Sequence, residues 1–235
     1  MIPFDKNYLS LIDSLCVISS KVVIENGERV KIFNGNAGKD STLFYDLSAP
    51  VEKFLFDIPK IAFNNFHDFF QIMNSFQAPV LALKENKLTI KKDKSKFSYV
   101  LAEPEIIECE VFINLDDFKL SSTFNISDNE LVEIKKMVNL IRTCEKGSDI
   151  VWTEIKSEEG KLKIVFHTHN HNNSFEQDFD YKVESEEPNA KVAADVFTAL
   201  PKGNYEVFVY NGSIVRFKLV SEEFDLNIYA GVKNE

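Results

Sequence analysis

The chain has 235 residues, of which 44% are hydrophobic and 27% charged, a composition typical of chains that fold around a substantial core. This length allows one large domain or two of ordinary size. Eight glycines and seven prolines exclude collagenous and low-complexity chains. The formal net charge of −10 predicts repulsion from nucleic acids and anionic membranes, unless the positive side chains gather on one surface.

The three cysteines, Cys16, Cys109 and Cys144, are far apart and form no CxxC pair. We therefore expect reduced thiols, and neither a zinc ribbon, a redox motif nor a disulfide framework. The first residues, MIPFDK, lack the basic and apolar regions of a signal peptide. Since no apolar run approaches the roughly 18 residues of a transmembrane helix, the sequence predicts a soluble cytoplasmic protein with no membrane partner.

The first half of the sequence alternates helical and strand patterns. Apolar residues recur with helical spacing over 4–18 and again over 64–76, which predicts two amphipathic helices. Turn residues separate short apolar segments, and loops this short allow only antiparallel pairing. Two hairpins are predicted on this basis, at 22–24 with 30–33 and at 80–83 with 88–91.

The second half repeats this alternation. A helix is predicted to begin at Ser127, where Glu130 completes a capping box, and its apolar stripe is Leu131, Ile134, Val138 and Ile141. A short helix over 193–200 should end before a proline. The predicted strands are 150–155 with 162–166, 205–210 with 214–219 around an Asn-Gly turn, and a terminal strand over 224–232.

The order of these elements predicts an α+β fold built from two similar domains, each with antiparallel sheets and helices on one face. The expected boundaries are 1–108 and 109–235, with an acidic, proline-containing connector at about 102–117. The two halves share an order of elements, but they do not align residue by residue.

No motif in the sequence indicates catalysis. The segment Asn34 to Ser41 contains glycines and a lysine, but its spacing differs from that of a phosphate-binding loop, and we expect a hairpin turn. His167, His169 and His171 alternate as metal ligands on a strand would, but neighbouring asparagines and Ser174 favour a solvated hairpin end. We therefore expect a non-enzymatic protein without cofactor or metal.

Positive charge is distributed unevenly among the predicted elements. On the helix that begins at Ser127, the side opposite the apolar stripe is polar except for Val132, and it carries Lys135, Lys136, Asn139, Arg142 and Thr143. Other cations flank the remaining helices, namely Lys6, Lys21, Lys191 and Lys202. Acidic residues concentrate in predicted loops and strands. A solvated helix face is the simpler interpretation of one such helix, but the distribution also fits a basic surface on an acidic protein.

The chain resembles the sliding clamps, the ring-shaped processivity factors of DNA polymerases, of the type carried by T-even bacteriophages. The resemblance rests on the opening helix YLSLIDSL, on FHDFFQI followed by strands, on ISDNEL opening the long helix, and on the turn PKGNY entering paired strands. It implies two similar domains per subunit and a head-to-tail homotrimer that encircles double-stranded DNA. The ring would tether a DNA polymerase and be opened by a clamp loader, in the cytoplasm of an infected host cell if the protein is viral.

The resemblance also implies roles for particular residues. The DNA-binding surface would comprise Lys6, Lys21, Lys135, Lys136, Asn139, Arg142, Lys191 and Lys202. Partner tails would dock in an apolar pocket formed by Ile106, Ile107, Val111, Tyr229 and Val232. The edges that join subunits would be strands at 96–101 and 175–183, because an unpaired edge favours strand addition.

Two other classes of function stay open at this point. One is a non-enzymatic β-rich structural or adaptor protein, for instance of a virion, whose only chemistry is oligomerisation. The other is a metal-dependent enzyme built around His167, His169 and His171.

Overall fold

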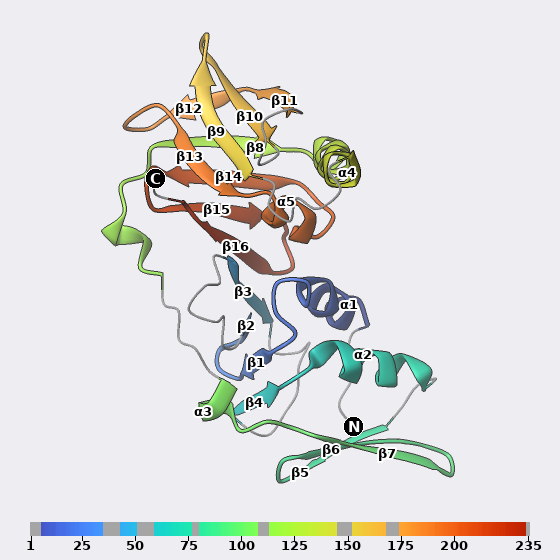
Figure 1. Cartoon of the computed structure of the whole chain (residues 1–235). Helices are drawn as coiled ribbons and strands as arrows, with labels where there is room; N and C mark the ends of the chain where they lie inside the picture. Colours follow the sequence, from blue (N-terminus) through green and yellow to red (C-terminus); the bar gives the residue numbers. More distant parts are fainter. Residues whose placement is uncertain are drawn as a thin grey trace. The chain divides into compact units, whose positions relative to one another are not determined.

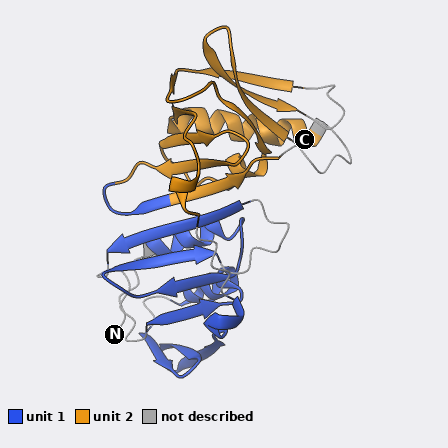
Figure 2. Cartoon of the chain, turned by 90° about the vertical axis from the view of Figure 1, so that its left-hand side faces the viewer, with its two compact units in different colours: residues 1–111, 222–226 blue, residues 112–221, 227–235 orange. Residues whose placement is uncertain are grey.

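The computed structural model describes residues 6–34, 43–50, 59–76, 80–107, 113–144, 152–167 and 174–233. The chain divides into two compact units, 1–111 with 222–226, and 112–221 with 227–235 (Figure 2). Each unit combines antiparallel sheets with helices (Figure 1), so the predicted α+β class is confirmed. The glycine-containing segment 35–41, predicted to form a hairpin turn, lies outside the described residues.

Unit 1 contains the first set of elements in chain order. They are α1 (Lys6–Leu15), β1 (Val22–Glu25), β2 (Arg29–Asn34), β3 (Leu43–Pro50), β4 (Lys60–Phe63), α2 (Phe66–Ser75), β5 (Val80–Lys84), β6 (Lys87–Lys92), β7 (Ser95–Val100) and α3 (Pro104–Ile107). Strands β3-β2-β1-β4 pair antiparallel in this order, and β5-β6-β7 form a separate three-stranded sheet. Both predicted hairpins are confirmed; the short helix α3 had no clear signal in the sequence.

The core of unit 1 is built from the predicted helix faces and a group of aromatic rings. Tyr8, Ile12 and Leu15 of α1 are buried, as are Phe66, Phe69 and Met73 of α2. The ring of Phe63 on β4 lies 5.1 Å from that of Phe66 and 4.8 Å from that of Phe69. Aromatic pairs at these separations add to the hydrophobic stabilisation, which explains why phenylalanines cluster in this part of the sequence.

Residues 222–226 join unit 1 although they come late in the chain. The ring of Phe224 contacts that of Tyr8 edge-on at 5.5 Å, and the Tyr8 hydroxyl donates to the Glu223 carbonyl oxygen at 3.3 Å. Arg29 forms an ion pair with Asp225 at 3.2 Å. These contacts are non-local, so the sequence pattern did not reveal them.

Unit 2 contains the remaining elements. They are a 3₁₀ turn (Leu115–Asp117), β8 (Ser122–Ile126), α4 (Asp128–Cys144), β9 (Trp152–Glu158), β10 (Lys161–His167), β11 (Ser174–Phe179), β12 (Tyr181–Val183), β13 (Asn189–Ala193), α5 (Asp195–Ala199), β14 (Tyr205–Tyr210), β15 (Ile214–Leu219) and β16 (Asp225–Gly231). Its strands follow the orders β12-β8-β14-β15-β16 and β11-β10-β9-β13. The hairpins predicted at β9–β10 and β14–β15 are confirmed.

Helix α5 connects the two strand groups of unit 2 through one buried ring. Phe197 contacts Phe166 of β10 at 5.2 Å and Phe217 of β15 at 5.4 Å, in both cases edge-on. All three rings are fully buried. The short helix is therefore held by packing rather than by helix propensity, which is weak in a segment of this length.

Helix α4 begins as the capping box predicted. The Ser127 hydroxyl oxygen accepts from the Glu130 amide at 3.3 Å, and a Glu130 carboxylate oxygen accepts from the Ser127 amide at 2.7 Å. The predicted stripe of Leu131, Ile134, Val138 and Ile141 is buried. The apolar spacing and the cap therefore agree on where this helix begins and which face it buries.

We predict that Ser127→Ala lowers the free energy of unfolding by about 1 kcal/mol, because the first turn of α4 loses its cap. Denaturant unfolding of the full chain checks this value. Asn139→Ala, on the exposed face of the same helix, is the control and should change stability by no more than about 0.5 kcal/mol. Equal effects of the two substitutions would contradict a specific role for the cap.

Candidate nucleic-acid interface

The exposed face of α4 is the first part of the predicted DNA-binding surface. Lys136 and Asn139 are exposed there, three residues apart and therefore on the same side of the helix. Val132 and Leu140 are also exposed, so this face is not purely basic. Lys136 forms no ion pair with any other residue that the structure describes.

Lys135 is directed toward α5 instead of being freely exposed. Its ammonium group donates a hydrogen bond to the carbonyl oxygen of Leu200, the residue that caps the C-terminal end of α5. Burial lowers the pKa of Lys135 below its ordinary value, and the negative charge of Asp128 partly opposes that shift. A cation at a helix C-terminus satisfies an orphan carbonyl and is favoured by the helix dipole.

Arg142 also contacts α5, at the opposite end. Its guanidinium forms an ion pair with Asp195, which lies in the first turn of α5. Lys135 and Arg142 thus hold the two ends of α5 against α4. Because Leu200 and Asp195 are more than fifty residues further along the chain, no local pattern in the sequence indicated these contacts.

Lys202 lies beside the beginning of α4. Its ammonium group is 3.5 Å from a carboxylate oxygen of Asp128, and its side chain is 82% exposed. Asp128 also accepts from the Gly203 amide at 3.0 Å, and its own amide donates to the Asn204 side chain at 2.9 Å. The 201–204 turn therefore places Lys202 next to the first turn of α4.

The other predicted cations lie elsewhere. Lys21 lies between α1 and β1 in unit 1, and the side chain of Lys6 is outside the described part of the structure. Lys191 lies on β13, in the wall of a pocket described below. The structure thus associates Lys136, Asn139 and Lys202 with the surface of α4, and gives Lys135 and Arg142 contacts to α5.

His67 on α2 contacts a residue of α1. Its Nδ1 atom lies 2.8 Å from an Asp13 carboxylate oxygen. Asp68 accepts from the side chain of Asn65 at 2.7 Å. The Asp13–His67 contact therefore links α1 to α2, which adjacency in sequence could not indicate.

The residues predicted to form a partner pocket have different environments. Ile106 is 70% exposed, whereas Ile107 is buried with Val23 and Ala62 in the unit 1 core. Tyr229 is buried, and Val111 lies outside the described residues. Val232 is the one of these five that lines the pocket found in unit 2, as far as the described residues show.

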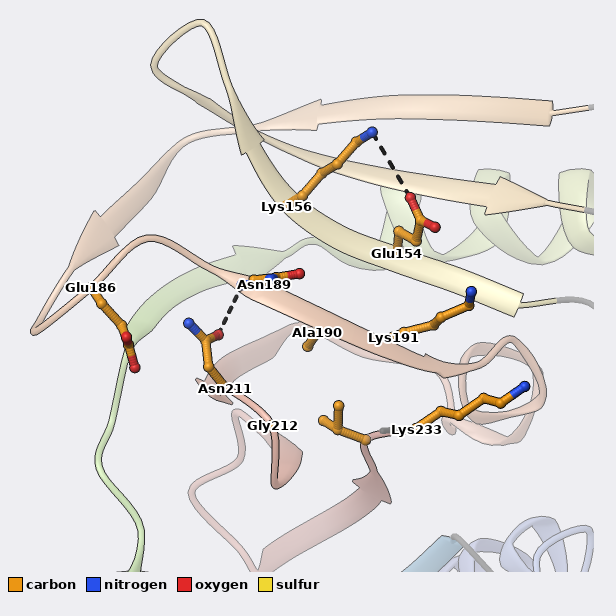
Figure 3. A pocket seen from close by; sticks show the side chains of 10 residues that line it. Glu154, Lys156, Glu186, Asn189, Ala190, Lys191, Asn211, Gly212 and Lys233 are labelled. Atoms are coloured by element: carbon orange, nitrogen blue, oxygen red, sulfur yellow. Dashed lines mark hydrogen bonds and ion pairs between the residues drawn. The ribbon is translucent and has the colours of Figure 1, made fainter. Parts of the chain in front are cut away.

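That pocket has a volume of about 620 Å³ and lies beside β13 (Figure 3). Its walls come from β9, β13, the turn between β14 and β15, and the residues that follow β16. Charged and amide side chains dominate the lining, among them Glu154, Lys156, Asn189, Lys191 and Lys233. No local pattern in the sequence indicated this pocket, because its walls come from segments that are tens of residues apart.

The described residues offer no metal centre. No group of three or more histidine, cysteine, aspartate or glutamate side chains comes together among them. Of the three alternating histidines only His167 is described; its Nε2 atom lies 3.2 Å from Glu154, and His169 and His171 are outside the described ranges.

No helix in the described part of the chain is long and apolar enough to cross a membrane.

Cys16 is a poor nucleophile in its environment. Burial, reinforced by the negative charge of Asp13, raises the pKa of the Cys16 thiol to about 12. The thiolate, which is the reactive form, is therefore scarce near neutral pH.

We predict that iodoacetamide at pH 8 alkylates Cys16 at least about tenfold more slowly in the native chain than in denaturant, since the thiolate is suppressed by burial. Peptide-resolved mass spectrometry measures the modification of each cysteine separately. Labelling of native Cys16 at the denatured rate would contradict this environment.

Known structures provide a comparison for the whole chain, although no protein-family model and no curated protein matches its sequence. A structure of A. fulgidus PCNA with the C-terminal region of FEN-1 bound is 14% identical, with a TM-score of 0.70, and covers 100% of this chain and 99% of its own. PCNA from Thermococcus kodakaraensis is 15% identical, with a TM-score of 0.69 and 98% coverage of both chains. PCNA from Entamoeba histolytica is 13% identical, with a TM-score of 0.70, and covers 97% of this chain and 96% of its own. The chain therefore has the α+β fold of the PCNA-type sliding clamps.

Proposed function

We propose that this protein is a sliding clamp, a ring-forming subunit that encircles duplex DNA and tethers a replicative polymerase. The observation that carries the proposal is the structural match to PCNA-type clamps over 97–100% of the chain. Because the match covers the full length, the similarity extends to the whole fold of the chain and is not limited to one shared domain. In this role the protein has no active site, and its chemistry is confined to assembly and to contacts with DNA and partner proteins.

The DNA-facing groups in this proposal centre on the exposed side of α4. Lys136, Asn139 and Lys202 supply positive and polar groups there, and Lys6 and Lys21 would add to them from unit 1. Lys135 and Arg142 would act indirectly, since each is engaged with α5. Weak, sparse contacts suit a ring that must slide, because strong neutralisation of phosphates would hold it in place.

Assembly into a ring requires a different surface at each end of the subunit. Strands β7 and β11 are edge strands of their sheets, and β7 exposes Phe97 and Val100. Lys96 on β7 and Glu176 on β11 carry opposite charges, which favours pairing between copies. We infer a head-to-tail homotrimer joined through these edges, loaded onto DNA by a clamp loader.

The T-even bacteriophage type remains part of this proposal. It rests on the sequence segments quoted above and implies that the protein works in the cytoplasm of an infected cell. The polymerase and the loader would then come from the same phage.

We predict that light scattering of the purified chain gives about 81 kDa, three times the 26.9 kDa of one subunit. Phe97→Asp combined with Val100→Asp should yield monomers, since charges on the edge oppose strand pairing. Val220→Asp is the matched control, because Val220 is also exposed but lies outside both edges. A wild-type monomer at micromolar concentration would argue against the stable ring.

We predict that Lys136→Glu combined with Lys202→Glu shortens the synthesis tracts of the cognate polymerase several-fold and leaves the trimer intact. The reason is that two attractive groups on the α4 surface become repulsive toward phosphate. Primed circular DNA with polymerase and loader from the same source provides the assay. Lys182→Glu is the control, since Lys182 is exposed on β12 and belongs neither to α4 nor to the 201–204 turn. Unchanged tracts in the double variant would refute the role of this face, and a wild-type trimer without any effect on synthesis would favour a structural or adaptor protein.

A further inference from the structure

One face of the β5-β6-β7 sheet is basic and carries no acidic residue. The strand register places nine side chains on this face, which we call the lysine face: Val80, Ala82, Lys84, Lys87, Thr89, Lys91, Lys96, Ser98 and Val100. All are exposed except Thr89, which is half-buried. None of the four lysines forms an ion pair with a residue that the structure describes. The nearest acidic residues in sequence, Glu85 and Asp93, belong to the two turns.

The opposite face of this sheet is apolar and packs within unit 1. Leu88 and Ile90 are fully buried there. The ring of Tyr99 lies 5.6 Å from that of Phe69 on α2, and the Tyr99 hydroxyl donates to the Asn65 carbonyl oxygen at 2.7 Å. Helix α2 therefore covers that side of the sheet (Figure 1), and the lysine face points away from the unit 1 core.

Two pairs of these lysines lie directly opposite each other on neighbouring strands. Lys84 on β5 is paired with Lys87 on β6, and Lys91 on β6 is paired with Lys96 on β7. Side chains in such positions have Cβ atoms about 5 Å apart, so like charges there repel each other and destabilise the sheet. An anionic ligand on the lysine face would relieve this repulsion, which favours its binding.

The dimensions of the lysine face fit a phosphodiester backbone. Lys87 and Lys91 are four residues apart on one strand, which separates them by about 13 Å, and neighbouring strands lie about 4.8 Å apart. About 13 Å along a DNA helix contains roughly four phosphates of one strand. Charges more than about 10 Å away are largely screened at about 0.1 M salt. The lysines on this face therefore outweigh the net charge of −10, which belongs to the chain as a whole.

The composition of the lysine face favours nucleic acid over an acidic protein. Protein interfaces draw most of their affinity from tryptophan, tyrosine and arginine anchors, and none of the nine residues is aromatic or arginine. Non-specific binding of nucleic acid comes instead from attraction between lysines and phosphates, and hydroxyl groups such as those of Thr89 and Ser98 also contact phosphates. Since no ring is present on which a base could stack, we expect contacts to the backbone and not to bases.

We propose that the lysine face binds the phosphodiester backbone of nucleic acid. This surface is separate from the α4 surface, because it lies on strands of unit 1. It goes beyond the clamp function and does not depend on ring formation, since one chain carries the whole face. In a ring joined through β7, Lys84, Lys87 and Lys91 would stay accessible on β5 and β6.

Fluorescence anisotropy tests the proposal with the full chain and two labelled probes, a short oligothymidine and a duplex of the same length. We expect saturable binding at about 50 mM salt that weakens at least about tenfold at about 200 mM, because counterions are released from about three phosphates. The two probes show whether the lysine face takes a single strand or a duplex.

Lys84→Glu combined with Lys91→Glu should weaken binding at least about tenfold, since two attractive groups become repulsive toward phosphate. Lys161→Glu combined with Lys182→Glu is the matched control, because it changes the net charge equally. Both control lysines are exposed on strands of unit 2 and have an acidic partner, Asp178 and Glu184 respectively. The control should bind within about threefold of the wild type.

Lys91→Gln keeps the proposal falsifiable if the charge reversals disturb folding. It removes one phosphate contact, so the slope of log K against log salt should fall in magnitude by about one. Its thermal unfolding temperature should be no lower than that of the wild type, since it removes the repulsion from Lys96.

The proposal is overturned if neither probe binds, if the Lys84→Glu, Lys91→Glu variant binds like the wild type, or if binding is lost only in the Lys136→Glu, Lys202→Glu variant of the α4 surface. A polyglutamate peptide is added as a competitor. If it displaces the probe more effectively than unlabelled DNA does, the lysine face belongs to an acidic protein segment instead. Light scattering and the synthesis assay are separate measurements, so failure of the ring can be distinguished from failure of this surface.

Discussion

The burial of one stripe of α4 is the constraint on which the proposed DNA surface depends. Leu131, Ile134, Val138 and Ile141 must face the core, so the polar side of the helix is determined by its 3.6-residue period. Not every cation on that side is available to a ligand. Lys135 and Arg142 lie near the border of the buried stripe and bind the two ends of α5.

This division gives helix α4 two physical roles. Its border cations stabilise the position of α5, whose Phe197 in turn packs between rings from β10 and β15. Its outermost groups, Lys136 and Asn139, are exposed to solvent. A substitution of Lys135 or Arg142 therefore affects packing in unit 2. A substitution on the exposed face instead affects the contacts that α4 can make with a ligand. Mutants that combine both kinds of position would confuse the two effects.

The acidic composition of the chain fits the proposed function only because charge is distributed unevenly. Among the residues that the structure describes, most carboxylates lie in loops and strands, and several have a cation nearby, such as Glu158 with Lys163 at 3.0 Å. The hydrogen bond and charge of Lys163 lower the pKa of Glu158, so this carboxylate remains ionised. Local pairing, and not net charge alone, therefore determines how negative a given surface is.

The sequence by itself determined the elements whose signals are local. The capping box at Ser127, the stripe of α4, and the hairpin around the Asn-Gly turn involve residues within a few positions of each other, so spacing was sufficient to predict them. The α+β class followed from the order of these elements. Tertiary structure alone decided that Lys135 and Arg142 contact α5 and that His67 contacts Asp13. It also decided that Ile107 is buried and that Lys191 and Lys233 line one pocket. These contacts join residues tens of positions apart, and their partners are selected by how the sheets and helices pack, which no local pattern encodes.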